Sequence, residues 1–113
     1  MDKSSALGAL AAIANETRLD VFRLLVQTGG EGLPAGEIAA RLKVLKNTLS
    51  THLTILVHAG LIRRAREGRV IRYRADYDAM RGLLQYLLHD CCQGETAICA
   101  PLADALSCEV RRA

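Results

Sequence analysis

The chain has 113 residues, of which 50% are hydrophobic, 24% are charged and only 4% are aromatic. This length allows one compact domain, and the apolar fraction excludes a disordered protein. No apolar run approaches the ~18–20 residues that a helix needs to span a bilayer, which excludes a transmembrane protein. Without Trp and with one Phe, the core must come from aliphatic residues, which favours helices. A domain this small also gains stability by burying a further surface in a dimer.

The start of the chain imitates a signal peptide, because Lys3 precedes the apolar stretch Ala6–Ala14. Asp2 cancels the charge of Lys3, however, and the helical period continues past the stretch, so we interpret it as an ordinary first helix. We therefore expect a cytoplasmic protein whose four cysteines are reduced thiols.

The positive charge is concentrated near the middle of the chain. The formal net charge is only +3. Residues 63–74 nevertheless contain six arginines and one glutamate, a net charge of +5. Residues 75–113 contain three basic and six acidic residues, a net charge of −3. A dense basic patch followed by an acidic tail is typical of a nucleic-acid-binding protein.

Two helices are predicted in the first thirty residues. Residues 5–14 form an Ala-rich helix. Its apolar residues near one face are Leu7, Leu10 and Ile13. Asn15 is a good N-cap for a second helix, which ends at Gly29-Gly30. The apolar residues at helical spacing in the second helix are Val21, Phe22, Leu25 and Val26.

The next two helices are predicted to form a helix-turn-helix. Pro34 suits the start of the third helix. Its inward residues are Ile38, Ala39 and Leu42. A short turn, Lys43–Lys46, leads to a fourth helix that runs from Asn47 to about His58 and is stopped by Gly60.

After Gly60 the apolar pattern changes from a helical period to alternation. Leu61–Arg66 and Arg69–Arg74 are predicted to be two strands of a hairpin that turns at Glu67-Gly68. An arginine-rich hairpin directly after a helix-turn-helix predicts a winged helix-turn-helix, a mainly α fold with a β-hairpin.

The helical period returns at Asp76 and predicts a fifth helix. We expect this helix to run into Cys91-Cys92 and to end near Gly94. Residues 95–113 lack a strong period, and we expect a loosely ordered tail with a short helix around Leu102–Leu106.

The fourth helix has one apolar and one polar side. At about 100° per residue, its inward residues are Leu49, Leu53, Leu56 and Val57, and its outward residues are Asn47, Thr51, Thr54 and His58. Thr48 and Ser50 flank the outward side. Short polar side chains let a helix approach base edges and also donate to phosphates. An ordinary surface helix would show the same pattern, but the following arginines favour DNA, with Lys46 and the hairpin supplying the salt-sensitive affinity.

Five short motifs resemble the arsenical-resistance repressor (ArsR/SmtB) family over roughly residues 6–92. They are Ala14–Leu19, Gly36–Ala39, Thr48–Leu53, Ala59–Ile62 and Arg66–Arg69. The resemblance implies a winged-helix homodimer, paired through its first and last helices, on operator DNA with two-fold symmetry. With the hairpin, it predicts DNA contacts at Lys46, Asn47, Thr48, Ser50, Thr51, His52, Arg66, Arg69 and Arg72.

The cysteines are clustered: Cys91, Cys92, Cys99 and Cys108 all lie in the last 23 residues. Clustered thiols suggest a soft-ion site. Adjacent cysteines have Cα atoms ~3.8 Å apart, closer than the ~4.4 Å minimum that is usual for a disulfide. The Cys91-Cys92 pair should therefore stay available as thiols. Three thiolates without a nearby histidine suit trivalent arsenic or antimony, As(III) or Sb(III).

The resemblance supports this interpretation. The third helix lacks the family's usual Cys-x-Cys box, whereas a subset of arsenic-responsive members has a Cys-Cys pair at the end of the last helix and a further Cys beyond it. Cys91, Cys92 and Cys99 are similar to that subset, and Cys108 is a spare or substitute ligand. We therefore expect residues 1–94 to form a DNA-binding and dimerisation domain and residues 95–113 to form a tail that contributes to the effector site.

The sequence predicts a DNA-binding repressor that releases its operator when As(III) or Sb(III) binds, but alternatives remain open. The family's zinc sensors place acids and histidines along the last helix, and Asp76, Asp78 and His89 fall near that register, with Cys92 where the final acid would be. The thiols could instead form a redox switch or be inert, leaving an architectural DNA binder. An enzyme is not expected, because the chain lacks a Cys-x-x-Cys motif, a βαβ pattern and a phosphate-binding glycine loop.

Overall fold

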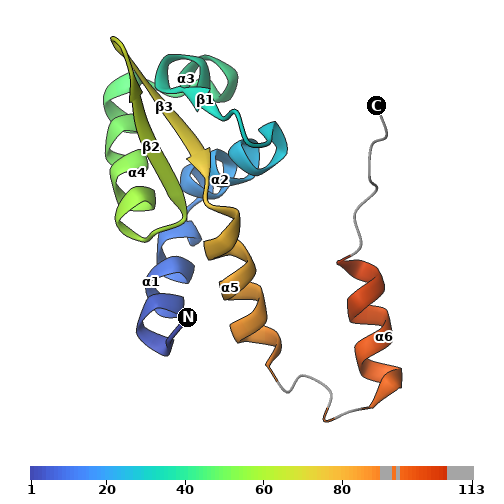
Figure 1. Cartoon of the computed structure of the whole chain (residues 1–113). Coiled ribbons are helices and arrows are strands. Elements are labelled where there is room, and N and C mark those ends of the chain that lie inside the picture. Colours follow the sequence, from blue (N-terminus) through green and yellow to red (C-terminus); the bar gives the residue numbers. More distant parts are fainter. Residues whose placement is uncertain (90–92, 94, 107–113) are drawn as a thin grey trace, which may run out of the picture.

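The computed structural model describes residues 1–89, 93 and 95–106 (Figure 1). In chain order, its elements are α1 (Lys3–Ile13), α2 (Glu16–Thr28), β1 (Leu33–Pro34), α3 (Ala35–Leu42), α4 (Lys46–His58), β2 (Ile62–Glu67), β3 (Val70–Ala75), α5 (Tyr77–Leu88) and α6 (Thr96–Ala105). This order confirms the winged helix-turn-helix. Within the described residues, none of the helices is long and apolar enough to cross a membrane.

The three strands form an antiparallel sheet in the order β1-β3-β2. Glu67 pairs with Val70, so the hairpin turns at Gly68-Arg69 and not at Glu67-Gly68 as the sequence predicted. Gly68 has a φ of 65°, a left-handed conformation that glycine adopts without steric cost. The register therefore shifts so that the glycine, and not Glu67, takes the first position of the turn.

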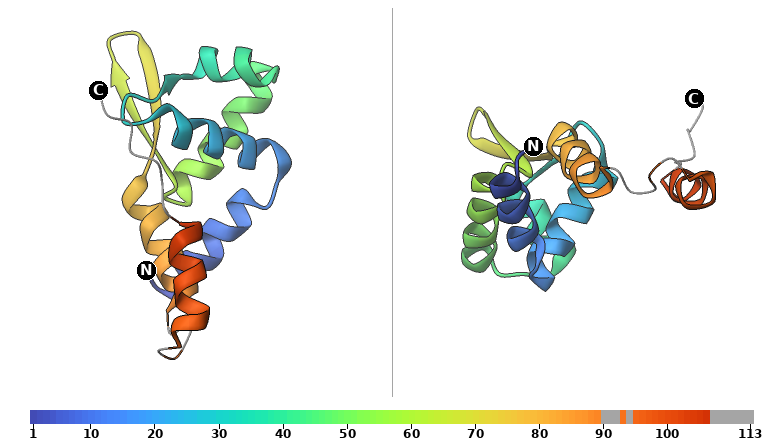
Figure 2. Two further views of the ribbon diagram at one scale, coloured as in Figure 1. Left: turned by 90° about the vertical axis from the view of Figure 1, so that its right-hand side faces the viewer. Right: turned by 90° about the horizontal axis from the view of Figure 1, so that it is seen from below.

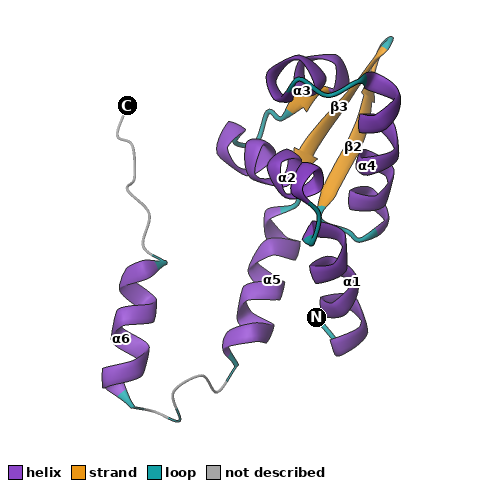
Figure 3. Cartoon of the chain, turned by 180° about the vertical axis from the view of Figure 1, so that it is seen from behind, coloured by secondary structure: helices purple, strands orange, loops and turns teal. Residues whose placement is uncertain are grey.

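The core lies between the sheet and helices α2, α3 and α4, which Figure 3 shows from behind. Leu25 of α2, Ile38 of α3 and Leu53 of α4 are buried there. Ile62 and Tyr73, on the sheet face that these helices cover, are buried as well. The predicted inward faces of the second, third and fourth helices are thus confirmed.

α1 and α5 extend from the same end of the winged body and contact each other (Figure 2). Asp2 caps α1 by accepting a 2.7 Å hydrogen bond from the N–H of Ser5. The buried residues of α1 are Ala6, Ala9 and Ala12, whereas Leu7 is 58% exposed. Of the three apolar residues that the sequence places near one face, Leu10 and Ile13 pack against the core, whereas Leu7 does not, because the small alanines allow α1 to pack closely and leave that leucine outside.

The C-terminal region differs from its prediction in two ways. α5 ends at Leu88, before the cysteine pair, and its last turn carries no basic residue to complement the helix dipole. The expected loose tail contains instead the ten-residue helix α6, which begins at Thr96. Four alanines favour this helix although Pro101 lies inside it. In Figures 1 and 2, α6 stands apart from the winged body.

Candidate nucleic-acid interface

The helix-turn-helix presents the polar side of α4 to solvent. α3 ends at Leu42, Lys43 adopts a left-handed φ of 55°, and α4 begins at Lys46. The buried residues of α4 are Leu49, Leu53 and Leu56. The predicted DNA contacts that lie exposed on α4 are Lys46, Asn47, Thr48, Ser50 and Thr51. The structure therefore brings these five residues together on one accessible surface.

His52 does not share that surface. It is half-buried, and its Nδ1 lies 3.2 Å from Nη1 of Arg18 in α2. Arg18 also donates from Nε to the carbonyl oxygen of Ala12 in α1, at 2.5 Å. One guanidinium thus joins α1, α2 and α4. His52 was predicted as a DNA contact, but its bond to Arg18 helps to orient α4 relative to α2. Arg18 lies in the Ala14–Leu19 motif, but no sequence pattern indicated its partner.

Two wing arginines are held on the outer face of the sheet. Arg72 Nε and Arg74 Nη2 each donate to Glu67, both at 3.1 Å. These hydrogen bonds lower the pKa of the Glu67 carboxyl, and the bond from Arg72 has the largest effect. Arg72 Nη1 also lies 3.3 Å from the carbonyl oxygen of Gly32, and Arg74 Nε donates to that of Gly30 at 2.9 Å. Arg72, a predicted DNA contact, is therefore engaged within the protein.

A third wing arginine joins the hairpin to α5. Arg63 Nε donates to Oδ2 of Asp76 at 2.8 Å, while Oδ1 of Asp76 accepts from the N–H of Ala79 at 3.0 Å and caps α5. Burial raises the pKa of Asp76, but the bonds from Ala79 and Arg63 outweigh it and lower the pKa below its ordinary value. Asp76 thus links β2 to the first turn of α5.

Arg64, Arg66 and Arg69 provide the accessible charge of the wing. All three are exposed, and within the described residues none forms an ion pair with an acid. Arg66 Nε donates to the carbonyl oxygen of Gly68, 3.2 Å away, near the tip. The predicted contacts Arg66 and Arg69 are therefore available to a phosphate backbone, and so is Arg64, which the prediction did not include.

Most of the predicted effector site lies outside the described residues. This holds for Cys91, Cys92 and Cys108. Cys99 lies half-buried in α6 and is disulfide-bonded, which differs from the reduced thiol that the sequence predicted. The other three cysteines, which are its potential disulfide partners within the chain, all lie within nine residues of Cys99 in the sequence.

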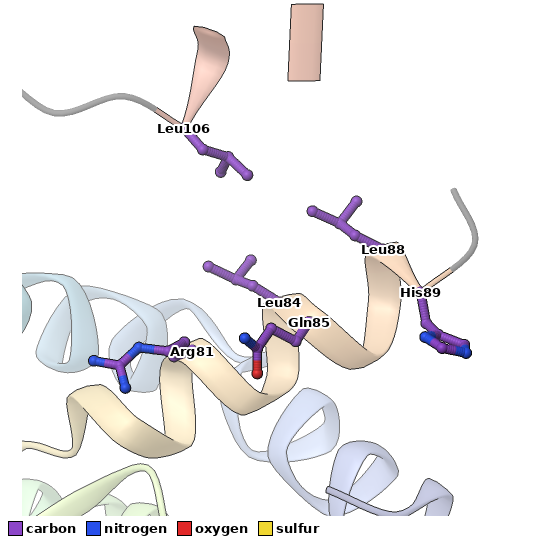
Figure 4. Close-up of a pocket in the computed structure, with 6 residues that line it drawn as sticks. All are labelled: Arg81, Leu84, Gln85, Leu88, His89 and Leu106. Carbon is purple, nitrogen blue, oxygen red and sulfur yellow. The ribbon is translucent and has the colours of Figure 1, made fainter. Parts of the chain in front are cut away.

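The residues of the zinc alternative do not gather in the described part of the chain, where no group of three potential metal ligands occurs. Both carboxylate oxygens of Asp76 are engaged by Arg63 and Ala79. Asp78 pairs with Arg81 at 3.1 Å. An open hollow of about 740 Å³ lies between α5 and the end of α6. Leu84 and Leu88 face Leu106 across it (Figure 4). Its lining combines these three leucines with Arg81, Gln85 and His89, of which only His89 is a potential metal ligand.

Comparisons with known proteins agree with this geometry. The helix-turn-helix domain family matches residues 13–65. The transcriptional activator HlyU of Vibrio cholerae is 30% identical over 95 residues, which cover 82% of this chain and 85% of that protein. A candidate arsenical resistance operon repressor of Halobacterium salinarum is 37% identical over 76 residues, which cover 67% of this chain and 56% of that protein.

A solved structure shares the fold. It is the homodimeric winged helix-turn-helix DNA-binding domain of Mb0332 from Mycobacterium bovis, a possible ArsR-family regulator. It is 29% identical, with a TM-score of 0.63, over 76% of this chain and 84% of that chain. These relatives are transcriptional regulators and not enzymes. The chain therefore belongs to the ArsR family of winged helix-turn-helix transcriptional regulators.

Proposed function

We propose that the chain is a homodimeric repressor that leaves its operator DNA when As(III) or Sb(III) binds to Cys91, Cys92 and Cys99. The observation that carries this proposal is the adjacent thiol pair, followed seven residues later by a third cysteine. Thiolates are the ligands that soft ions prefer. The similarity to a candidate arsenical resistance repressor supports the choice of arsenic.

Dimerisation is supported by the exposed leucines on α1 and α5. Leu7 is 58% exposed, Leu84 38% and Leu87 52%. α1 and α5 contact each other, and exposed leucines on two neighbouring helices are costly to leave in water, so that a second copy of the chain would cover them. Two copies would place two α4 helices on the half-sites of a symmetric operator, and the homodimeric Mb0332 domain has the same fold.

α5 connects the proposed effector site with the wing. The helix begins next to Asp76, which holds Arg63 of β2, and it ends at Leu88, three residues before Cys91. An ion bound at the C-terminal end would restrain α5 and thereby the dimer surface. The two α4 helices would then lose the spacing that fits the operator. A coupling free energy of ~1–3 kcal/mol would lower the affinity for DNA about 5–150-fold.

The test uses a labelled duplex selected from a random library by the wild-type chain. In the presence of a reductant, arsenite should release the wild type and the Cys108→Ser control, but not the variant Cys91→Ser/Cys92→Ser. Zinc titrated in parallel should leave all three proteins bound. Release of the double variant by arsenite would show that the proposed site is wrong.

A thiol-redox response is the second candidate, favoured by the disulfide at Cys99. Two thiols would lose two protons and two electrons to form the S–S bond, and hydrogen peroxide would accept them and become two molecules of water. Peroxide should then release the wild type from DNA, and dithiothreitol should restore binding. Cys99→Ser should remain bound. If catalase-treated peroxide releases the wild type equally well, this candidate fails.

A further inference from the structure

The six arginines of the hairpin differ in what holds them. Arg63, Arg72 and Arg74 have acidic partners, whereas Arg64 and Arg66 lie on the opposite face of β2 from Arg63. Two of these side chains bind Glu67: that of Arg72 is 29% exposed and that of Arg74 is 37% exposed. The side chain of Arg63, which binds Asp76, is 72% exposed. The two arginines on Glu67 are therefore the most protected of the ion-paired arginines in the wing.

The loop between α2 and β1 completes the enclosure of these two arginines. Their guanidinium groups donate to the carbonyl oxygens of Gly30 and Gly32 as well as to Glu67. The loop can approach this closely only because Gly32 has no side chain: its φ is 66°, and a Cβ there would collide with the carbonyl oxygen of Tyr73. Each guanidinium is thus bound simultaneously by a carboxylate and by at least one backbone carbonyl.

We propose that Glu67 is a positioning residue of the wing that withholds Arg72 and Arg74 from DNA phosphates and uses them to fasten the hairpin to the Gly30–Gly32 loop. The proposal rests on DNA binding by this chain and is independent of the effector. Arg64, Arg66 and Arg69 then provide the wing's phosphate contacts. The hairpin tip projects beyond the helices, where a duplex can reach it (Figure 3).

The salt dependence of DNA binding measures the number of phosphates that a protein neutralises. Each contact contributes about 0.9 to the steepness of log Kobs against log salt. In the wild type, Arg72→Gln should leave this slope unchanged, whereas Arg64→Gln should reduce its steepness by about 0.9. Glu67→Gln removes the carboxylate charge and should steepen the slope by up to about 1.8, since two arginines become available.

The experiment uses fluorescence anisotropy on a mixed-sequence duplex of 24 base pairs, with full-length protein. Glu31→Gln is the matched control, because it removes the same charge beside Arg72 and Arg74 but has no ion pair with either. Its slope should equal that of the wild type. Arg72→Gln alone should have the slope of the wild type, whereas the double variant Glu67→Gln/Arg72→Gln should have a less steep slope than Glu67→Gln alone. This dependence distinguishes an arginine that Glu67 withholds from DNA from an arginine with a merely structural role.

Two results would overturn the inference. The first is a salt dependence for Glu67→Gln that is no steeper than that for Glu31→Gln. The second is a salt dependence for the single variant Arg72→Gln that is reduced as much as that for Arg64→Gln. With either result, an effect of Arg64→Gln still supports DNA binding by the wing. If neither the wild type nor any variant binds the duplex in a salt-dependent way, DNA binding itself fails and the inference fails with it.

Discussion

Thr51 and His52 are neighbours on α4, but their side chains meet different surroundings. Thr51 is exposed, whereas His52 is half-buried against Arg18. We predict that Thr51→Ala weakens DNA binding and changes the free energy of unfolding by less than ~0.5 kcal/mol. His52→Ala should lower the free energy of unfolding by about 1–2 kcal/mol, because it removes a hydrogen bond to a charged group. Urea unfolding and DNA titration measure the two effects.

Arg18→Lys serves as the companion variant for His52→Ala. A lysine keeps the charge but cannot reach Ala12 and His52 with two separate N–H groups of one planar fork. It should therefore lose stability to a similar degree. An unfolding free energy for His52→Ala equal to that of Thr51→Ala would contradict the orienting role of the histidine.

The sequence could predict only in part which site residues are exposed to DNA and which are bound by other residues of the protein. The outward side of α4 follows from the helical period, so Asn47, Ser50 and Thr51 could be found from the sequence alone. The partner of Arg72 could not, since the carbonyl of Gly32 is 40 residues away in the chain. Alternation along a strand indicates which side chains share a face, but not what covers that face.

At the level of elements, Asp76 joins the wing to α5, and this link should be measurable. Asp76→Ala removes both the cap on Ala79 and the acceptor for Arg63. The free energy of unfolding should fall by about 1 kcal/mol, the usual cost of a lost N-cap. Asp76→Asn retains an acceptor for the N–H of Ala79 and should cost less. Thermal or urea unfolding near pH 7 compares the three proteins.

The same carboxylate makes stability depend on pH. Its folded pKa lies below the ordinary value of 3.8, so below that value the unfolded chain binds the proton more readily than the folded chain. The stabilisation is fully present above the unfolded pKa and is lost as the pH falls through the lower folded pKa. The wild type should therefore lose its advantage over Asp76→Asn in acid. A constant difference between the two proteins at all pH values would contradict this.

Elements with a strong period and a clear boundary residue were predicted well. Asn15 caps α2 through a 3.1 Å bond from the N–H of Arg18, and Gly29 ends that helix with a φ of 86°. β1 was missed, because Leu33–Pro34 is too short to show alternation and exists only through pairing with β3. The end of α5 and the start of α6 were misplaced, because helix ends depend on local dipole and capping energies of about 1 kcal/mol or less.

For the whole molecule, the unusual feature is how apolar side chains are distributed between α1 and α5. In α1 the buried residues are Ala6, Ala9 and Ala12, whereas Leu7 is exposed; in α5 only Leu83 is buried, and Leu84 and Leu87 are exposed. An isolated protomer would gain from the opposite arrangement. The pattern therefore makes sense for a molecule that completes its core with a second copy, consistent with the marginal stability of so short a chain.

We predict that Leu87→Glu converts the protein to a monomer and weakens binding to a two-fold symmetric duplex by at least tenfold. The charge would be buried in the proposed α1–α5 surface without a partner, which association cannot offset, and a monomer contacts only one half-site. Sedimentation velocity and DNA titration test this. Gln27→Glu adds the same charge to an exposed position of α2 and should remain dimeric. A dimeric Leu87→Glu variant with wild-type DNA affinity would place the subunit contact elsewhere.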